Sequence, residues 1–450
     1  MNRRRWLKAA AIAFCIIGLA TPRAAFAHAT LLRSTPAANS RLDKSPDGIR
    51  LVFSEQVVPS LSQIAVVCSG GDSLQLKVAN DPHDVHVLVG PVGAQLAGSC
   101  RVLWRVLSAD GHPVSGNFAF DVAGDSGVAS STTPVAAPVS SPDSIRGVTA
   151  PGTADTTPNA EDKPVPVFAS LFRGVGLGAF MAGVGILFFG LTAGERRALA
   201  PGAVVTSLIA VGTLLLVAHA FAWVEHASPT GHLTGSFVSS LLDSTVGRVE
   251  LSRVIFAVLT LWAIALARHR KIALGLGIAC IVLSGAVGHP AAIHPIVAIP
   301  AKIIHLLAAT TWIGGLLWLA WVASRDAEAC RIEARRVSSI ALVAVIAIFL
   351  SGLLQAFLFL NTPSDLFRYD YGKLVFSKIV GLLILICFGI YNKYKLVPRV
   401  DAIDVQKKLS RSVKLEMAVI TLVFLISGFL AYVPTPPVER APTTMTGSSR

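Results

Sequence analysis

The chain has 450 residues, of which 53% are hydrophobic and only 14% are charged. A soluble globular protein carries about 25% charged residues, so this composition excludes an ordinary soluble domain. The high apolar fraction also excludes a disordered or collagen-like chain, and six cysteines are too few for a disulfide scaffold. The formal net charge of +13 would favour nucleic acid in a soluble protein, whereas in a membrane protein the position of the charges decides their meaning.

Residues 1–27 predict an export signal. Four basic residues between positions 3 and 8 precede an apolar run from Ala9 to Ala20, and Ala25-Phe26-Ala27 has the small residues that signal peptidase reads. The apolar run of about a dozen residues is shorter than the roughly 20 of a membrane span, although an uncleaved anchor is the alternative. Cleavage after Ala27 makes His28 the first residue of the mature chain.

Residues 28–124 predict a small β domain. Their charge is nearly balanced, and short runs rich in β-branched residues alternate with turn residues, a pattern typical of a β-sandwich. The predicted strands include 49–53, 63–68, 85–89, 101–107 and 117–122. Export would place Cys68 and Cys100 in an oxidising compartment, where they are candidates for a disulfide. Residues 125–164 are rich in Ser, Thr, Pro, Ala and Gly, which predicts a flexible linker.

Residues 165–435 predict an all-α membrane bundle of about eight helices. Apolar stretches of roughly span length lie near 167–192, 203–224, 250–267, 272–288, 303–322, 338–360, 374–391 and 414–433. With the β domain outside, the predicted inner loops hold sixteen Lys and Arg residues, and the outer loops and the tail (residues 436–450) hold far fewer. This positive-inside asymmetry favours eight spans with both chain ends outside.

Six histidines fall at or near the outer ends of the predicted helices. They are His219, His226, His232, His289, His294 and His305. Imidazole binds copper, zinc and haem iron alike, so the residue type does not choose the ligand. Interfacial histidines can also serve only as hydrogen-bonding groups, but an ionisable residue within a membrane is a functional candidate, and His219 and His305 fit that description best. We expect Glu250, Arg253 and Lys378 to form structural ion pairs near the outer interface.

The β domain contains its own candidate metal site. Asp110-Gly111-His112 predicts a tight turn that presents Asp110 and His112 side by side, and a mature terminus at His28 adds an amine and an imidazole. A terminal amine, two imidazoles and a carboxylate together favour tetragonal Cu(II). A turn with a hydrogen-bonded histidine is the simpler alternative. We expect His83 and His86 to be ordinary surface histidines.

The β domain resembles the periplasmic copper-binding family CopC. The resemblance lies in the segments His28–Ala37, Leu51–Glu55 and Asp110–Gly116. It implies an Ig-like sandwich that binds Cu(II) through His28, Asp110 and His112, with Glu55 as a further candidate. Some members of the family also have a Met-rich Cu(I) site, but this chain has four methionines and none of them lies in the β domain.

The membrane half resembles the family CopD through His305–Gly315, Tyr371–Lys373 and Thr435–Pro437, so the whole chain resembles a CopC–CopD fusion. We take His219, His226, His289 and His305 as candidate copper ligands of the bundle. Thiolates and thioethers suit Cu(I), which makes Cu(I) a second candidate there and Met181, Cys280 and Cys387 candidate path residues, although each is more often a packing residue.

The resulting hypothesis is copper binding and transport, in the direction of uptake, at a bacterial inner membrane. Cu(II) is captured by a periplasmic N-terminal domain and passed to the histidine-rich bundle, with roles in copper homeostasis and resistance. The expected partners are the copper ion, the lipid bilayer and periplasmic copper proteins, with no nucleic acid and no catalysis. The alternative is a membrane redox protein that uses haem or copper to reduce cupric ion or quinone. Oxidative chemistry at the N-terminal histidine is a third hypothesis.

Overall fold

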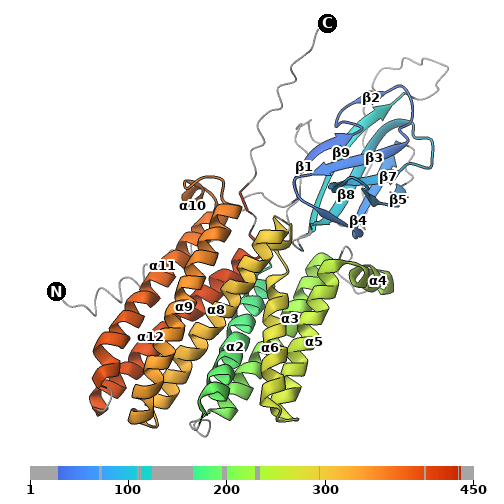
Figure 1. Ribbon diagram of the computed structural model, residues 1–450. Coiled ribbons are helices and arrows are strands. Elements are labelled where there is room, and N and C mark those ends of the chain that lie inside the picture. Colours follow the sequence, from blue (N-terminus) through green and yellow to red (C-terminus); the bar gives the residue numbers. More distant parts are fainter. Residues whose placement is uncertain are drawn as a thin grey trace, which may run out of the picture.

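A β-sandwich lies against one end of a helical bundle (Figure 1). The computed structural model describes residues 29–69, 73–108, 111, 113–123, 166–194, 200–228, 234–292, 294–399, 402–433 and 435–436. The predicted signal peptide and linker and nearly all of the tail lie outside these residues. So do His28, Asp110, His112 and His232, whose predicted roles therefore stay predictions.

The β domain is a sandwich of two sheets, as the sequence predicted. One sheet has the order β1-β3-β7-β6 and the other β2-β9-β8-β4-β5. All paired strands are antiparallel except β2 and β9, which run parallel. The strands are β1 (Leu31–Thr35), β2 (Arg41–Leu42), β3 (Gly48–Phe53), β4 (Val57–Cys68), β5 (Ser73–Leu76), β6 (Ala79–Asp81), β7 (Asp84–Pro91), β8 (Gly98–Ser108) and β9 (Pro113–Val122).

The sandwich core follows from alternation along the strands. In β3 every second residue, Ile49, Leu51 and Phe53, is buried, as expected for a strand with one face on a core. The ring of Phe53 meets that of Trp104 in β8 edge to face, with centroids 5.3 Å apart. Directly paired residues Cys68 of β4 and Cys100 of β8 form the disulfide that the sequence left as a candidate.

Four strands were missed from the sequence, because they are short or lack a β-branched run. They are β1, β2, β5 and β6. The segment Asn80-Asp81 has residue types that are common in turns, yet both residues belong to β6, and Asp81 forms an ion pair with Arg50 of β3. Pairing with β7 and this ion pair, rather than local propensity, place the segment in the sheet.

The described part of the bundle has eight long helices at the eight predicted positions. They are α2 (Val167–Thr192), α3 (Gly202–Ala227), α5 (Thr245–Ala265), α6 (Arg270–Gly285), α8 (Pro295–Ala323), α9 (Ala327–Phe359), α11 (Asp370–Tyr391) and α12 (Ile403–Leu430). Six of them are long and apolar enough to cross a membrane. The other two are α6, which has only 16 residues, and α5, which contains Arg248, Glu250 and Arg253.

Helix α2 lies in the middle of the bundle and packs closely against its neighbours. Gly185 of α2 faces Gly314 of α8 so tightly that a Cβ added at Gly314 would lie 2.2 Å from the Gly185 carbonyl carbon. A Cβ added at Gly212 of α3 would likewise lie 2.5 Å from the backbone nitrogen of Phe180. Small residues therefore permit the close backbone approach that is typical of membrane helices.

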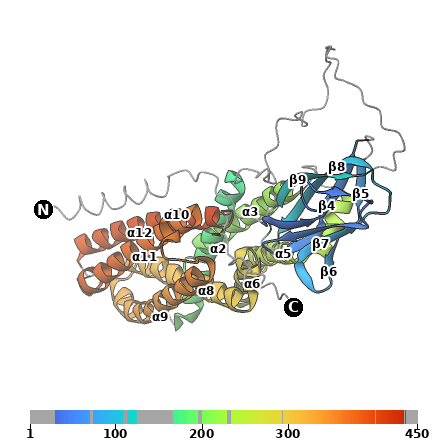
Figure 2. The ribbon, with the colours of Figure 1, turned by 90° about the horizontal axis from the view of Figure 1, so that it is seen from above.

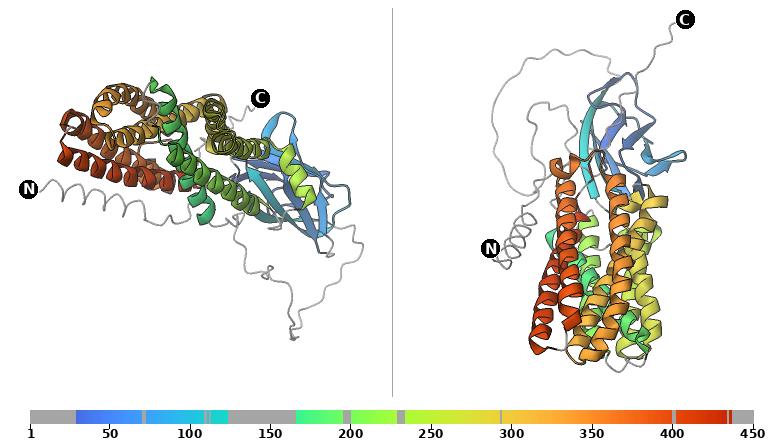
Figure 3. Two further views of the ribbon diagram at one scale, coloured as in Figure 1. Left: turned by 90° about the horizontal axis from the view of Figure 1, so that it is seen from below. Right: turned by 60° about the vertical axis from the view of Figure 1, so that its left-hand side comes forward.

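The sandwich covers only part of one end of the bundle, above the C-terminus of α3 and the N-terminus of α5 (Figures 2 and 3). We call this end of the bundle the sandwich end. We call the opposite end, where α2 stops at Thr192, the distal end.

The shorter elements are α4 (Gly235–Asp243), α7 (His289–Ala292), α10 (Asp365–Arg368), the π-helix η2 (Asn392–Leu396) and the 3-10 helix η3 (Val397–Arg399). Helix α4 was not predicted, and its Ser240 carbonyl accepts a hydrogen bond from Ser60 of β4 at 3.3 Å.

Candidate metal centre

The turn after β8 has the geometry that its Asp-Gly sequence predicts. Gly111 has a φ of +93°, in the left-handed region that glycine adopts without strain. Its backbone N–H donates to the carbonyl of Ser108 at 2.9 Å, which closes the turn. Asp110 and His112, the neighbours of Gly111 in sequence, lie outside the described residues.

The start of the described chain is fixed beside the loop after β3. Ala29, which follows His28 in sequence, is completely buried in the sandwich core. The N–H of Thr30 donates to Ser54 Oγ, and the N–H of Ser54 donates to the Thr30 carbonyl, both at 2.9 Å. These two hydrogen bonds hold the chain directly after His28 next to Glu55.

Glu55 joins this loop to the turn after β8. Its carboxylate accepts a hydrogen bond from Ser108 Oγ at 2.9 Å, and the residue is only 8% exposed. A buried carboxylate needs hydrogen-bond donors or a cation to compensate its lost hydration. The structure therefore brings together residues 29–30, residues 54–55, Ser108 and Gly111, which include or adjoin the predicted ligands.

This convergence lies on the bundle, against the outermost turns of α3. Trp223 Nε1 donates to the carbonyl of Gly111 at 3.0 Å. Arg105 of β8 donates through Nη2 to the carbonyls of Ala227 and Ser228, both at 3.0 Å, at the C-terminal end of α3. Cations satisfy helix C-terminal carbonyls well, because these groups lack partners within the helix.

An apolar cluster seals the same contact, and we call it the interface cluster. It consists of Leu61, Leu107, Ala169, Trp223, Ala227, Phe237, Val246 and Tyr432. Only the first two belong to the sandwich, and the others come from the bundle and its loops. Sequence reasoning missed this docking, since the contacts join residues more than a hundred positions apart.

His219 lies directly beneath the interface cluster and is completely buried. Its Nδ1 lies 3.2 Å from the carbonyl of Ala169 and 3.4 Å from the hydroxyl of Tyr432. A carbonyl can only accept, so Nδ1 is the protonated nitrogen of the neutral ring, and Nε2 has the free lone pair. Nε2 is buried without a hydrogen-bond partner among the described residues. A metal-binding imidazole is commonly oriented in this way by a hydrogen bond at its other nitrogen.

The other candidate histidines of the bundle have separate surroundings. His289 opens α7, and its Nε2 lies 3.0 Å from the carbonyl of Val433. His305 of α8 places Nδ1 3.1 Å from Ser351 Oγ of α9. His226 is half-buried in the last turn of α3, and His294 is exposed before α8. No group of three or more His, Cys, Asp or Glu side chains that could hold a metal ion occurs in the part of the chain that the structure describes.

The remaining predictions for the bundle have different outcomes. Glu250 and Arg253 form the expected ion pair within α5, whereas Lys378 forms none with a described residue, so its predicted ion pair is wrong for that part of the chain. Met181 and Cys280 are buried in one core cluster, which fits packing, and Cys387 is exposed on α11.

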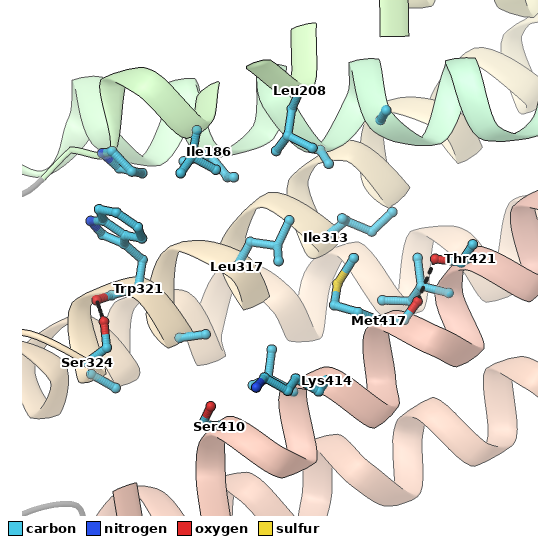
Figure 4. Close-up of a pocket in the computed structure, with 18 of the residues that line it drawn as sticks. Ile186, Leu208, Ile313, Leu317, Trp321, Ser324, Ser410, Lys414, Met417 and Thr421 are labelled. Carbon is cyan, nitrogen blue, oxygen red and sulfur yellow. Dashed lines mark hydrogen bonds between the residues drawn. The ribbon is translucent and has the colours of Figure 1, made fainter. Parts of the chain in front are cut away.

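A cavity of about 850 Å³ lies away from these histidines, between α2, α3, α8 and α12 (Figure 4). Apolar residues such as Ile186, Leu208 and Ile313 line most of it, and Lys414 and Ser410 lie at its distal side. Its described lining includes Met417 but no His, Cys, Asp or Glu. The cavity therefore has no place in the candidate metal centre.

The fold and the site thus define a multi-pass membrane protein with a β-sandwich docked beside a buried histidine. The CopC domain family matches residues 31–123, and the family described as copper resistance protein D, CopD, matches residues 332–430. The copper transport protein CutJ of Bacillus subtilis (strain 168) is 26% identical over 469 residues, covering 98% of this chain and 80% of CutJ.

Two further proteins are similar to one half of the chain each. The inner membrane protein YebZ of Escherichia coli (strain K12) is 30% identical over 247 residues, covering 51% of this chain and 81% of YebZ. The crystal structure of CopC from Methylosinus trichosporium OB3b is 28% identical and covers 23% of this chain and all of that one, with a TM-score of 0.21. The chain belongs to the copper resistance and transport family in which a CopC domain and a CopD domain share one polypeptide.

Proposed function

We propose that the protein captures Cu(II) in the sandwich, outside a bacterial inner membrane, and passes copper to the bundle at His219 for uptake. Cu(II) would be bound by the amine and imidazole of His28 and by Asp110 and His112. The convergence of residues 29–30 and 54–55 with Ser108 and Gly111 supports this ligand set, because each of these three predicted ligands is the sequence neighbour of Ala29 or Gly111. Glu55 lies among them as an additional carboxylate.

One observation carries the transfer step: the contact between Gly111 and Trp223. Gly111 lies between two predicted ligands in sequence, and Trp223 lies one helical turn from His219 on the same face of α3. His219 offers a buried Nε2 lone pair, so copper could exchange its sandwich ligands for this imidazole without entering bulk water. A tethered, docked donor also has a high local concentration at its acceptor.

Charge supports the proposed orientation. The connections from α5 to α6, α8 to α9 and α11 to α12 lie at the distal end, and together with the adjoining ends of these helices they hold most of the basic residues counted for the inner loops. Under the positive-inside rule this distribution supports an orientation with the distal end toward the cytoplasm and the sandwich in the periplasm.

The Cu(II) site is tested on the full chain by spectroscopy. A glycine inserted between Ala27 and the following histidine removes the terminal amine as a ligand while retaining every side chain. We expect its copper electron paramagnetic resonance spectrum to lose one nitrogen donor and its Cu(II) affinity to fall by at least tenfold. Unchanged spectrum and affinity would exclude the terminal amine.

The transfer step is tested by copper accumulation in cells that lack the gene and carry plasmid copies. His219→Gln should reduce accumulation to the level of the empty strain while leaving Cu(II) binding by the sandwich intact. His269→Gln is the matched control, since His269 is exposed before α6 at the distal end. Accumulation that is higher in the empty strain would show efflux, and a Soret band in the purified chain would favour the haem-dependent redox alternative.

A further inference from the structure

Four charged side chains lie together near the sandwich end of the bundle, and we call them the charge cluster; two are buried (Glu250 and Arg253) and two are half-buried (Arg173 and Lys302). They are Arg173 of α2, Glu250 and Arg253 of α5, and Lys302 of α8. Arg173 and Lys302 are each within electrostatic range of the other three members. Each member lies five to eight residues from the start of its helix. At 1.5 Å per residue this is about 8–12 Å along the helix, a depth at which uncompensated charge is costly.

Arg253 is the most deeply buried member, with no exposed surface. It forms an ion pair with Glu250, one turn earlier in α5. Its Nη2 contacts the Glu250 carboxylate in this ion pair, whereas Nε and Nη1 have no hydrogen-bond partner among the described residues. A guanidinium has five N–H donors, and a buried one is normally satisfied by carboxylate, carbonyl or anion.

The other two cations, unlike Arg253, have no acidic partner among the described residues. Lys302 Nζ donates to the carbonyl of Val287, which is a neutral acceptor. Arg173 forms neither a hydrogen bond nor an ion pair with any residue in the described ranges. The cluster therefore has three cations against the single carboxylate of Glu250, a formal excess of two positive charges.

Gly288 leaves space where two of the cations meet. It has a φ of +83° and precedes α7. A Cβ added to it would lie 3.6 Å from Lys302 Nζ and 3.9 Å from Arg173 Nη2. Those distances are ordinary contact distances, so the absent side chain leaves room for an atom in contact with both cations.

We propose that a small anion binds beside Gly288, between Arg173 and Lys302, and offsets the excess positive charge of the charge cluster. A halide, a free phosphate or a small carboxylate would each be recognised by the same chemistry, an ammonium and a guanidinium at close range. The bound anion also matters for copper, because it reduces an excess of positive charge that would repel an entering metal cation in a medium of low dielectric constant. The inference does not rest on copper transfer, and its test uses no copper.

The test is thermal unfolding of the purified full chain in detergent, free of copper. Sodium gluconate holds the ionic strength constant while chloride, phosphate or acetate replaces it in separate titrations. A ligand that binds only the folded state raises the unfolding temperature with a dependence set by its dissociation constant. We expect one of the three anions to raise it saturably.

The variants separate a site from a general salt effect. Arg173→Gln and Lys302→Gln should each raise the half-saturating anion concentration at least tenfold, whereas Arg173→Lys, which retains the charge, should raise it less. Arg248→Gln is the control, because Arg248 is exposed on α5, and it should titrate as the wild type does. The proposal is overturned if no anion stabilises the wild-type chain, or if Lys302→Gln and Arg173→Gln respond as Arg248→Gln does.

Discussion

Trp223 of α3 donates a hydrogen bond to the carbonyl of Gly111, 112 positions earlier in the chain, at 3.0 Å. The indole ring lies so close that a Cβ at Gly111 would be 3.1 Å from Nε1. This contact joins the turn that holds two predicted copper ligands to the helix that contains His219. Together with the hydrogen bonds from Arg105 to Ala227 and Ser228, it docks the sandwich on α3.

Trp223→Phe should loosen the turn after β8 without emptying the interface cluster. The phenyl ring retains most of the apolar contact but lacks the N–H donor, and a net hydrogen bond contributes about 1 kcal/mol. We expect backbone amides of residues 104–116 to exchange hydrogen about fivefold faster. Trp262→Phe serves as the control, because Trp262 is exposed on α5. Equal exchange in the two variants would show that the hydrogen bond does not fix the turn.

Arg105→Met should weaken the same docking from the other side. The change removes the donor for the carbonyls of Ala227 and Ser228 while keeping a long apolar stem. Hydrogen bonds from a charged donor contribute about 1.5–3 kcal/mol, reduced here because Arg105 is only half-buried.

The readout for Arg105→Met is hydrogen exchange in residues 222–228, which should become faster. Arg101→Met is a matched control on the same strand, since Arg101 is exposed. If Arg101→Met accelerates exchange as much as Arg105→Met does, the carbonyl contacts do not hold the sandwich on α3.

The sequence allowed the two-part architecture to be predicted because its signals are local. Apolar runs of span length mark each long helix, and alternation marks strands such as β3 and β8. The short strands β2 and β6 were not predicted, because they form through pairing with other strands and have no local signal in composition. The extension of α8 back to Pro295 was also missed, although proline is favoured at the first position of a helix.

For the candidate site, residue type could identify candidate side chains but could not show which of them lie close together. His219 and His305 were nominated together, yet one is oriented by Ala169 of α2 and the other by Ser351 of α9. The roles of Trp223 and Arg105 had no local signal at all, because an aromatic residue or a cation in these segments is ordinary. Such roles come from long-range docking, which a single sequence does not encode in any short window.

Removal of the disulfide should destabilise the sandwich. Cys68 and Cys100 are separated by 32 positions, and closing a loop of that length restricts the unfolded chain by about 3–4 kcal/mol. The double variant Cys68→Ser/Cys100→Ser should therefore unfold at lower denaturant concentration, as followed by near-ultraviolet circular dichroism. Cys387→Ser, at an exposed free cysteine, should leave the transition unchanged. An unshifted midpoint in the double variant would contradict the expectation.

Asp81 should make the stability of the sandwich depend on pH in the acid range. The side-chain hydrogen bond from Arg50, together with the backbone N–H of His83, holds the pKa of Asp81 below its ordinary value of 3.8. A carboxyl whose pKa is lower in the folded state stabilises the fold above the unfolded-state pKa, and loses that contribution as pH falls through the folded-state pKa.

Asp81→Asn removes this proton linkage while keeping the shape of the side chain. At pH 7 the variant should unfold at lower denaturant concentration than the wild type, and the difference should shrink steadily below about pH 4, where the wild-type carboxyl becomes protonated. Asp121→Asn is the control, since Asp121 is exposed on β9 and forms no ion pair with a described residue. A difference between the wild type and Asp81→Asn that stays constant down to about pH 3 would mean that the ion pair with Arg50 contributes nothing to folding, because only a linked carboxylate can make the two curves converge in acid.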